Sequence, residues 1–412
     1  MKENNRLERI TFDPKIFNGK PIKEDFMRTI MICLLILAFS VFSLPAEIKN
    51  ENKPSLGQWD FKLEKMWELD SAGDYPLVQV QSINVDNKGN LFLLEGKHFK
   101  FFVISPEGKY LYSFGNRGEG PGEYKFAFNF FLVNDAVIVP DQGKINYFKT
   151  NGEYVKSVNP GIMMFPREFI DENRFILVQD REDEKKTYEK VEIYDLNTNK
   201  RFTLAEVTAE KALTASSSSG GSQMVLRIKI GDTTPMVIAA VHNNVLYYGK
   251  NDNYLIKKTD FNGNELLSFS LQGKERKKIP LEFKKKRIDQ ISLNGGKIPT
   301  ELAEQMINGM PDYSTYFSNI GIEENGLIYV YLNDAANETG QEIDIFSPQG
   351  KYLYHAEISL PEGLKRSGPI EIKGSYLYVF AEDEEGEGKL LKFKITKPTR
   401  QSFASGGSGP FC

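Results

Sequence analysis

Short runs of alternating apolar and polar residues, separated by turns rich in glycine, asparagine and proline, fill most of the chain after residue 58. One turn occurs twice almost unchanged: residues 105–112 read SPEGKYLY and residues 347–354 read SPQGKYLY. Each copy ends one alternating run and starts another, which is the pattern of a β-hairpin. Looser copies begin at Thr150, Leu196 and Phe261. The pattern therefore predicts a repeat protein made of hairpins.

A second hairpin precedes each of these turns, so every repeat unit has two hairpins and four strands. Six units can be counted, at about residues 75–115, 125–158, 165–206, 223–271, 313–359 and 367–396. Four strands recurring every 40 to 50 residues or so are typical of the blades of a β-propeller. We therefore predict an all-β fold, a six-bladed β-propeller with four-stranded antiparallel blades.

Two features complete the predicted ring. Residues 59–69 alternate like a strand but have no hairpin partner, whereas the last unit shows only three strands. We therefore expect the N-terminal strand to complete the last blade and close the propeller. Residues 273–312 carry helix-forming segments with proline near their starts, which predicts a small helical insertion between blades 4 and 5. The Ser/Gly-rich residues 215–222 are expected to form a loop.

The N-terminal 46 residues have a different character. Arg28 precedes a 13-residue apolar run, and small residues follow it up to Ala46, so residues 27–46 are interpreted as a secretory signal peptide, with a signal anchor as the alternative. Residues 1–26 are then a non-native or relic extension. We expect a linker at 47–58, the propeller at 59–396 and a flexible C-terminal tail at 397–412. The protein is predicted to be exported, to the periplasm or cell envelope.

Charge and cysteine content narrow the choice of partners. The 52 basic and 56 acidic residues give a formal net charge of −4, which provides no overall attraction to nucleic acid or anionic lipid. Once the signal peptide is removed, Cys412 is the single cysteine left, so a disulfide framework or a cysteine-based metal site is excluded within one chain. We expect a monomer with no membrane-spanning segment in the mature chain.

Residues 114–124, FGNRGEGPGEY, follow VISPEGK at 103–109. This combination resembles the NHL-type repeat and the related bacterial six-bladed propellers of the TolB-like type. The resemblance covers most of residues 60–396 and implies the six-bladed fold. The relatives include binding scaffolds, lactonase-like hydrolases and a lyase of amidated-peptide synthesis, so the resemblance leaves the function open.

An acidic residue follows the second strand of every predicted unit. If the blades are equivalent, these residues share one face of the ring, and their carboxylates could hold a hard cation such as Ca²⁺. The alternative, which turn chemistry favours, is that each one caps its own turn. The six residues are Glu95, Asp141, Asp180, Asp252, Asp334 and Glu382.

Other candidate residues lie between the blades. The glycine-rich connection after the first unit has no following helix, so it is not a phosphate-binding loop; its Arg117, Glu119 and Glu123 can nevertheless project onto the open face. Weak metal-ligand candidates at the starts of the innermost strands are Asn129, Glu168 and Asn319, which loosely resemble the Glu/Asn set of lactonase-like propellers. The three histidines share no ligand spacing, and no nucleophile is paired with a base.

These observations favour a non-catalytic binding scaffold over an enzyme. It would recognise a protein, peptide or glycan on the loop face, with no cofactor other than a possible Ca²⁺. The residues expected near the ligand are Glu95, Arg117, Glu119, Glu123, Asp141, Arg167, Asp180 and Asp252. The alternative function is a metal-dependent hydrolase or lyase, using Ca²⁺ or Zn²⁺ in the central channel.

Overall fold

The structure is a computed structural model, which describes residues 47–396 apart from 142, 161–164, 183–186, 209–212, 220–221, 229–232, 290, 294–295 and 335–336. The predicted extension, signal peptide and C-terminal tail lie outside the described residues. So does Cys412. No helix within the described part of the chain has the length and apolar character needed to cross a membrane.

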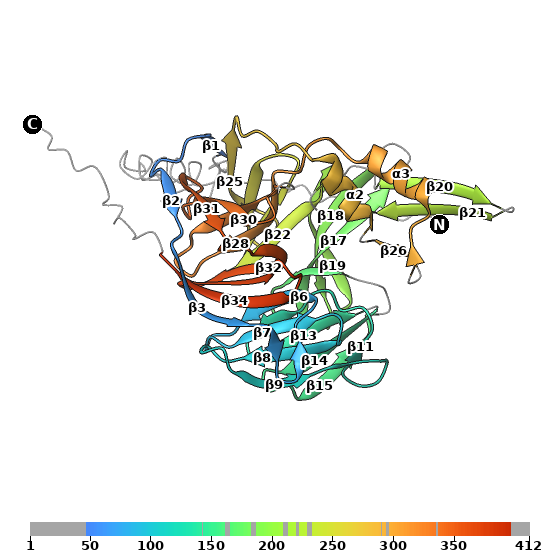
Figure 1. Ribbon diagram of the computed structural model, residues 1–412. Coiled ribbons are helices and arrows are strands. Elements are labelled where there is room, and N and C mark those ends of the chain that lie inside the picture. The colour runs from blue at the N-terminus through green and yellow to red at the C-terminus, as the bar shows by residue number, and fades with distance from the viewer. Residues whose placement is uncertain are drawn as a thin grey trace, which may run out of the picture. The chain divides into compact units, whose positions relative to one another are not determined.

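Six antiparallel sheets, the blades, form a ring, as the repeat pattern predicted (Figure 1). Blades 1 and 2 consist of β6 (Val80–Val85), β7 (Leu91–Glu95), β8 (Lys100–Ile104), β9 (Tyr110–Phe114), then β12 (Phe131–Val133), β13 (Ala136–Asp141), β14 (Lys144–Lys149) and β15 (Tyr154–Val158). Blade 3 consists of β16 (Pro166–Phe169), β17 (Arg174–Glu182), β18 (Thr187–Asp195) and β19 (Lys200–Thr208).

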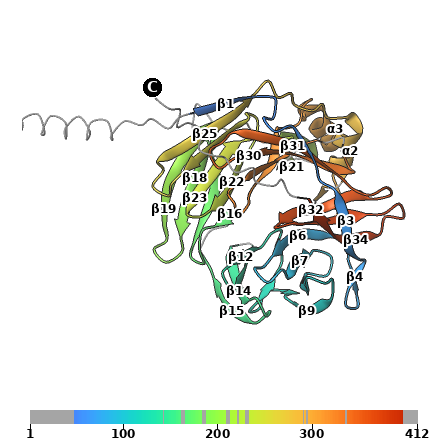
Figure 2. The ribbon, with the colours of Figure 1, turned by 90° about the vertical axis from the view of Figure 1, so that its left-hand side faces the viewer.

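The second half of the ring repeats this order. Blade 4 consists of β22 (Val237–His242), β23 (Val245–Lys250), β24 (Leu255–Thr259) and β25 (Glu265–Gln272). Blade 5 consists of β28 (Phe317–Ile322), β29 (Ile328–Leu332), β30 (Gly340–Phe346) and β31 (Tyr352–Ser359), and blade 6 begins with β32 (Lys365–Lys373), β33 (Tyr376–Glu382) and β34 (Gly388–Ile395). Figure 2 shows the first strands of the blades surrounding the middle of the ring.

The N-terminal strand closes the ring, as expected. β3 (Leu63–Leu69) pairs antiparallel with β34, from Leu63 opposite Ile395 to Leu69 opposite Leu390, and becomes the fourth strand of blade 6. Trp67 also joins this blade to blade 1, because its indole Nε1 donates a hydrogen bond of 3.0 Å to the carbonyl oxygen of Pro106. β3 therefore joins the first and last parts of the propeller, which are far apart in sequence, within one blade.

The twice-repeated phrase has a packing role between blades. In each copy the serine hydroxyl accepts backbone hydrogen bonds within the turn, at 3.2 Å for both Ser105 and Ser347. The glycine has a positive φ, 85° at Gly108 and 78° at Gly350, which a residue with a side chain rarely adopts. A Cβ at Gly108 would lie 2.8 Å from the ring of Trp67, and one at Gly350 would lie 2.8 Å from Phe269. The glycine thus lets the turn pack on an aromatic ring of the preceding blade.

The segment expected to be a linker, residues 47–58, instead forms parts of two blades. β1 (Glu47–Glu51) pairs parallel with β25, and β2 (Gln58–Asp60) pairs parallel with β31. Asn50 on β1 also joins blades 4 and 5. Its side-chain Nδ2 donates to the carbonyl oxygens of Ser270 and Gly350, and its Oδ1 accepts from the backbone amide of Tyr352. The linker prediction missed this because pairing at an open sheet edge uses backbone groups and requires no apolar pattern.

The predicted insertion between blades 4 and 5 contains α2 (Leu281–Asp289), the short strands β26 (Ser292–Leu293) and β27 (Gly296–Lys297), and α3 (Thr300–Gly309). Ile288, Leu302 and Met306 form its own small apolar core.

Within residues 215–222, predicted as a loop, the described part belongs to the hairpin of β20 (Leu213–Ser219) and β21 (Ser222–Ile228). Blade 4 consequently starts at Val237, and not near residue 223. Figure 1 shows α3 beside this hairpin, where Gln305 exchanges two 3.0 Å hydrogen bonds with Ser216.

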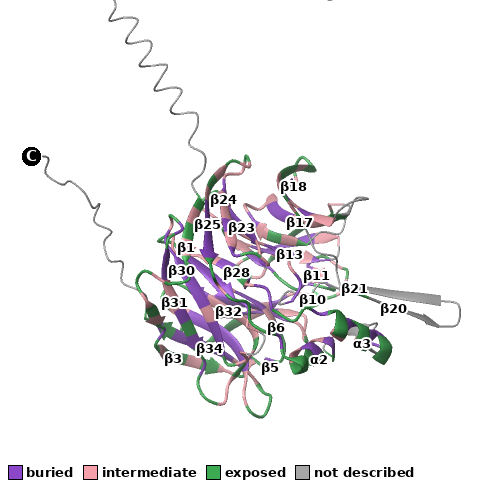
Figure 3. Cartoon of the chain, turned by 90° about the horizontal axis from the view of Figure 1, so that it is seen from above, coloured by how far each residue is buried: buried purple, intermediate pink, exposed green. Residues whose placement is uncertain are grey.

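The core lies between the blades. Buried apolar side chains of neighbouring sheets form clusters, such as Phe101, Phe130 and Val137 between blades 1 and 2. Figure 3 shows the burial concentrated along the strands of the ring, whereas the helices carry exposed faces. Since each blade contacts both neighbours through such clusters, the framework that carries the loops is continuous.

Candidate functional site

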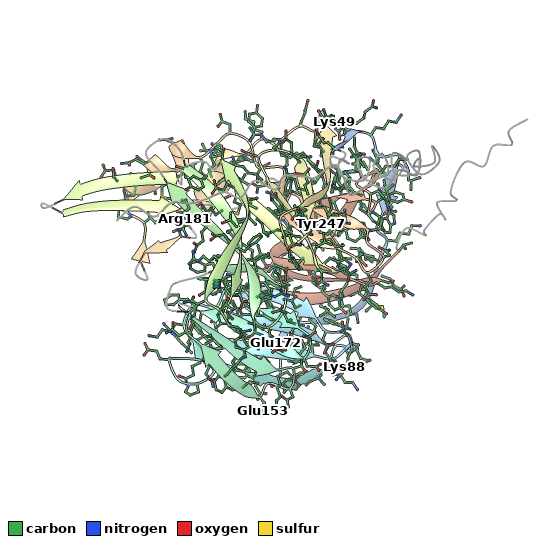
Figure 4. The ribbon with its side chains drawn as sticks, turned by 180° about the vertical axis from the view of Figure 1, so that it is seen from behind. Lys49, Lys88, Glu153, Glu172, Arg181 and Tyr247 are labelled. Atoms are coloured by element: carbon green, nitrogen blue, oxygen red, sulfur yellow. The ribbon has the colours of Figure 1, made fainter. Side chains whose placement is uncertain are left out.

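Antiparallel order places two kinds of connection on one face of the ring, which we call the loop face. These are the loops between the second and third strands of each blade and the connections that lead from one blade to the next. The tight turns after the first and third strands lie on the opposite face, the turn face; Lys88, Glu153 and Glu172, labelled in Figure 4, belong to such turns. The innermost strands all start at the loop face.

A cleft of about 370 Å³ opens on the loop face, where the innermost strands of blades 2 to 5 begin. Three phenylalanines on its rim are exposed, Phe126 by 47%, Phe128 by 60% and Phe165 by 57%. Pro140, Pro166 and Val237 to Ala239 add apolar surface. Large apolar side chains gathered at a concave surface typically mark a binding site. We call this cavity the aromatic cleft.

Few polar side chains line the aromatic cleft. The predicted ligand-binding residue Arg167 is exposed there, together with Asn129, Ser318 and Asn319. The Oδ1 of Asn129 accepts a 2.6 Å hydrogen bond from the hydroxyl of Ser82, and the Oδ1 of Asn319 accepts one of 2.9 Å from the amide of Ile320. Arg167 is therefore the cation that can orient an anionic group in this cleft.

A second cleft, of about 490 Å³, lies between blades 5 and 6 and beside α2. It is mostly polar, and its cations are Lys286, Arg287, Lys365 and Arg366, against the acids Asp334, Glu338 and Glu382. Lys286 pairs with Glu338 at 2.6 Å, and Lys277 lies 3.7 Å from Asp334. We call this cavity the basic cleft.

Two of the predicted ring acids have a structural role. Glu95 is fully buried, and its carboxylate accepts hydrogen bonds from the backbone amides of Gln79 at 2.8 Å and His98 at 2.6 Å. Asp141 is buried as well and accepts from the amides of Lys125 and Phe126. Both carboxylates fix the connection that enters their own blade. Both residues therefore cap local backbone amides, which is the alternative to cation binding that turn chemistry favoured.

The remaining ring acids are distributed among separate local contacts. Asp252 forms an ion pair of 2.6 Å with Lys250, Asp180 is exposed at the end of β17, and Glu382 lines the basic cleft. Among the described residues, no group of three or more His, Cys, Asp or Glu side chains is arranged to hold a metal ion. The acids share a face of the ring but do not meet at one point.

The glycine-rich connection of residues 115–124 is held by local contacts. Glu119 is ion-paired with Lys125, and the carboxylate of Glu123 accepts a 2.8 Å hydrogen bond from the amide of Gly120. The guanidinium of Arg117 lies over the ring of Phe99, 4.8 Å from its centroid. These three predicted residues thus stabilise the connection beside the aromatic cleft.

Two carboxyl groups with raised pKa values lie on the innermost strands of opposite blades. Burial raises the pKa of Glu168 on β16 to about 7, and the charge of Glu371 on β32 raises it further. Burial also raises the pKa of Glu371 to about 7, with a smaller contribution from Glu323. Of the weak metal candidates, Asn129 and Asn319 each accept one hydrogen bond through Oδ1, and Glu168 accepts one of 3.3 Å from the backbone amide of Phe169. A metal site at these three residues stays a prediction.

These two carboxyls predict a pH-dependent stability. A raised carboxyl pKa means that the unfolded chain releases its proton first, so the free energy of unfolding falls as the pH rises from about 4.3 towards 7. We expect Glu371→Gln to raise the free energy of unfolding by about 1–3 kcal/mol at pH 8 and to have little effect at pH 4.5. Denaturant titrations at both pH values test this, with the exposed Glu64→Gln as control. An equal effect of Glu371→Gln at both pH values would contradict the assignment.

The sequence did not predict one buried polar cluster, which surrounds Asp344. Asp344, fully buried on β30, accepts hydrogen bonds from the hydroxyls of Tyr254 and Tyr352 at 2.8 and 2.7 Å and lies 2.8 Å from the Nδ1 of His355. The ammonium of Lys274, at the start of the insertion, lies 3.0 Å from the same carboxylate. The cluster fixes the base of the insertion to blades 4 and 5.

Comparison with known proteins identifies the fold. No curated protein matches the chain. Among solved structures, it is similar to a candidate exported protein of Bacteroides fragilis NCTC 9343, with 15% identity over 85% of this chain and all of that one and a TM-score of 0.49. It is also similar to a member of the duf4221 family from Bacteroides vulgatus, with 10% identity, coverage of 82% and 98% and a TM-score of 0.49.

A third similar structure is virginiamycin B lyase from Staphylococcus aureus, with 13% identity, coverage of 82% of this chain and 100% of that one, and a TM-score of 0.41. With identities of 10–15% and TM-scores below 0.5, these three similarities carry no argument about this chain. The family model described as 6-bladed beta-propeller, DUF5128, matches residues 67–294, which is more than half of the chain. The protein therefore belongs to the DUF5128 family of six-bladed β-propellers.

Proposed function

We propose that this protein is a non-catalytic binding scaffold, which recognises a ligand at the aromatic cleft on the loop face. The observation that carries the proposal is the exposure of Phe126, Phe128 and Phe165 around one concave surface. Exposing three large apolar side chains to water is unfavourable, and burying each under a ligand contributes about 1.5–3 kcal/mol. A rigid ring with a clustered aromatic anchor is the arrangement expected of a binding surface.

Export is part of the proposal. It rests on the signal-like residues 27–46 and is in keeping with the description of the similar Bacteroides fragilis protein. The assignment to the NHL-repeat or TolB-like type rests on the FGNRGEGPGEY phrase at 114–124. We propose that the mature protein works in the periplasm or cell envelope as a monomer.

The proposal predicts that the rim controls binding. A library of random 12-residue peptides displayed on phage, together with an array of oligosaccharides, can supply a ligand for the purified chain. Phe128→Ser is expected to weaken the affinity for any selected ligand about tenfold or more, because a central aromatic anchor is lost. The control is Tyr110→Ser, a similarly exposed aromatic residue on β9, remote from the cleft. Ligands that bind both variants as they bind the original chain would contradict the proposal.

The second candidate is a hydrolase or lyase that works in the central channel. It is favoured by two carboxyls on innermost strands, Glu168 on β16 and Glu371 on β32, because burial raises the pKa of each to about 7, which suits proton transfer. Elemental analysis combined with turnover of a lactone tests it. Stoichiometric Ca²⁺ or Zn²⁺ together with turnover lost in Glu168→Gln would support this candidate, and a chain without turnover would leave the scaffold.

A further inference from the structure

We propose that the ligand is a peptide segment with an apolar side chain followed by acidic residues, bound across the aromatic cleft and the basic cleft together. This inference rests on the proposed function and specifies its ligand class. The apolar side chain would enter the aromatic cleft. The acidic residues would lie in the basic cleft, beside α2.

The two clefts are neighbours. Ser318 and Asn319, at the start of β28, line both of them, and both residues are exposed on the loop face. These two residues are therefore the boundary that the two cavities share. Their hydroxyl and amide groups can form hydrogen bonds with the backbone of an extended peptide at the crossing point. One continuous ligand can therefore occupy both cavities.

The charges of the basic cleft select an acidic partner. Its lining carries four cations and three acids, and Lys277 beside it is balanced by Glu342, with which it forms an ion pair of 3.0 Å. Lys286 already compensates Glu338. Arg167 in the aromatic cleft adds another cation, whereas the carboxylate of Asp141 there is buried against backbone amides. In a chain with a net charge of −4, this local excess of positive charge favours an anionic segment.

The composition of the aromatic cleft favours a peptide over a glycan. Sugars present many hydroxyl groups, and binding them requires many hydrogen-bonding partners. The lining offers prolines, phenylalanines and aliphatic residues instead, and the oxygens of Asn129 and Asn319 are already engaged. An apolar side chain of a peptide has no hydrogen bonds to lose in such surroundings, whereas a sugar hydroxyl that leaves water without gaining a partner is unfavourable. Phenylalanine, unlike tyrosine or tryptophan, also has no polar atom to offer a sugar.

The test compares the peptides selected by the original chain with those selected by variants of each cleft. A display library of random 12-residue peptides is selected against the chain without residues 1–46, against Lys365→Glu with Arg167→Glu, and against the control Lys88→Glu. Lys365 and Arg167 are exposed cations of the two clefts, and Lys88 is exposed on the turn face (Figure 4). Polygalacturonic acid serves as a polyanion without apolar side chains.

We expect the original chain and the control to select peptides that combine an aromatic or aliphatic residue with at least two acidic residues. The charge-reversed variant should bind these peptides about tenfold or more weakly, and the loss should diminish at high salt. Selected peptides without acidic residues would overturn the inference while leaving the scaffold in place. Tight binding of polygalacturonic acid with no selected peptide would overturn it too. No binding of peptides or oligosaccharides would count against the scaffold itself.

Discussion

A chain that begins at Asp70 is expected to lose the cooperative unfolding of the propeller, or to melt about 10 °C or more below the chain that begins at Glu47. The truncation removes β3, and with it the backbone pairing to β34 and the packing of Leu63, Trp67 and Leu69. The outer edge of blade 6 would then be open, and the Trp67 contacts with Pro106 and Gly108 of blade 1 would be lost. Thermal melting followed by circular dichroism measures this.

Two controls distinguish ring closure from a general effect of shortening. A chain that begins at Gly57 lacks β1 but retains β2 and β3, so it should keep one cooperative transition at a moderately lower temperature. Within β3, Trp67→Ala should cost about 3 kcal/mol, whereas Met66→Ala, exposed by 47% on the same strand, should cost little. An unchanged melting curve for the chain that begins at Asp70 would contradict closure by β3.

Replacing Asp344 by alanine is expected to lower the free energy of unfolding by about 3–5 kcal/mol, because it leaves the ammonium of Lys274, whose side chain is 13% exposed, and two buried hydroxyls without their acceptor. The insertion should also become more accessible to proteases, since Lys274 loses its anchor in blade 5. Urea titration and limited trypsin digestion measure the two effects. Asp260→Ala serves as control, because Asp260 caps an exposed turn.

The same carboxylate predicts the behaviour in acid. Burial opposes its ionisation, but hydrogen bonds from His355, Tyr352 and Tyr254 and the charge of Lys274 together hold the pKa of Asp344 below its ordinary value. Its stabilisation is therefore complete above the unfolded pKa of about 3.9 and is lost as the pH falls through the lower folded pKa. The difference between the original chain and Asp344→Ala should shrink below pH 4. A difference that grows there would contradict the ion pair.

The repeat pattern was sufficient to predict the ring, because each blade encodes its own hairpins. The SPEGKYLY and SPQGKYLY turns are local, and their glycines and serines specify a turn whatever surrounds it. Closure by residues 63–69 could also be predicted, because the N-terminal strand lacked a hairpin partner and the last blade lacked a fourth strand. The position of the helices followed from local signals as well.

The missed elements depend on contacts distant in sequence. β1 and β2 pair with blades some 200 to 300 residues away through backbone groups, so residues 47–58 look like a linker. The hairpin of β20 and β21 has a serine-rich composition that is typical of loops. The cluster around Asp344 assembles side chains from blades 4 and 5 and the insertion, none of which forms a motif.

For the candidate site, the sequence predicted residues that lie at the loop face but not the cleft that several of them line. Arg167, Asn129 and Asn319 do lie at the aromatic cleft, because they start innermost strands. The acids were more conspicuous, yet Glu95 and Asp141 are used as caps. Phe126, Phe128 and Phe165 were not among the residues predicted from the sequence, since exposure of an aromatic side chain depends on how the blades and their connections meet.

Hydrogen exchange of backbone amides, with and without a selected acidic peptide, tests the central claim most directly. Binding at the loop face predicts slower exchange at residues 126–131, 165–169, 237–239 and 318–319, with the basic cleft at 365–370 protected in the same complex. The turns on the opposite face, such as residues 86–90 and 171–173, should exchange unchanged. Protection confined to those turns or to the outer strands would contradict a binding site at the mouth of this propeller.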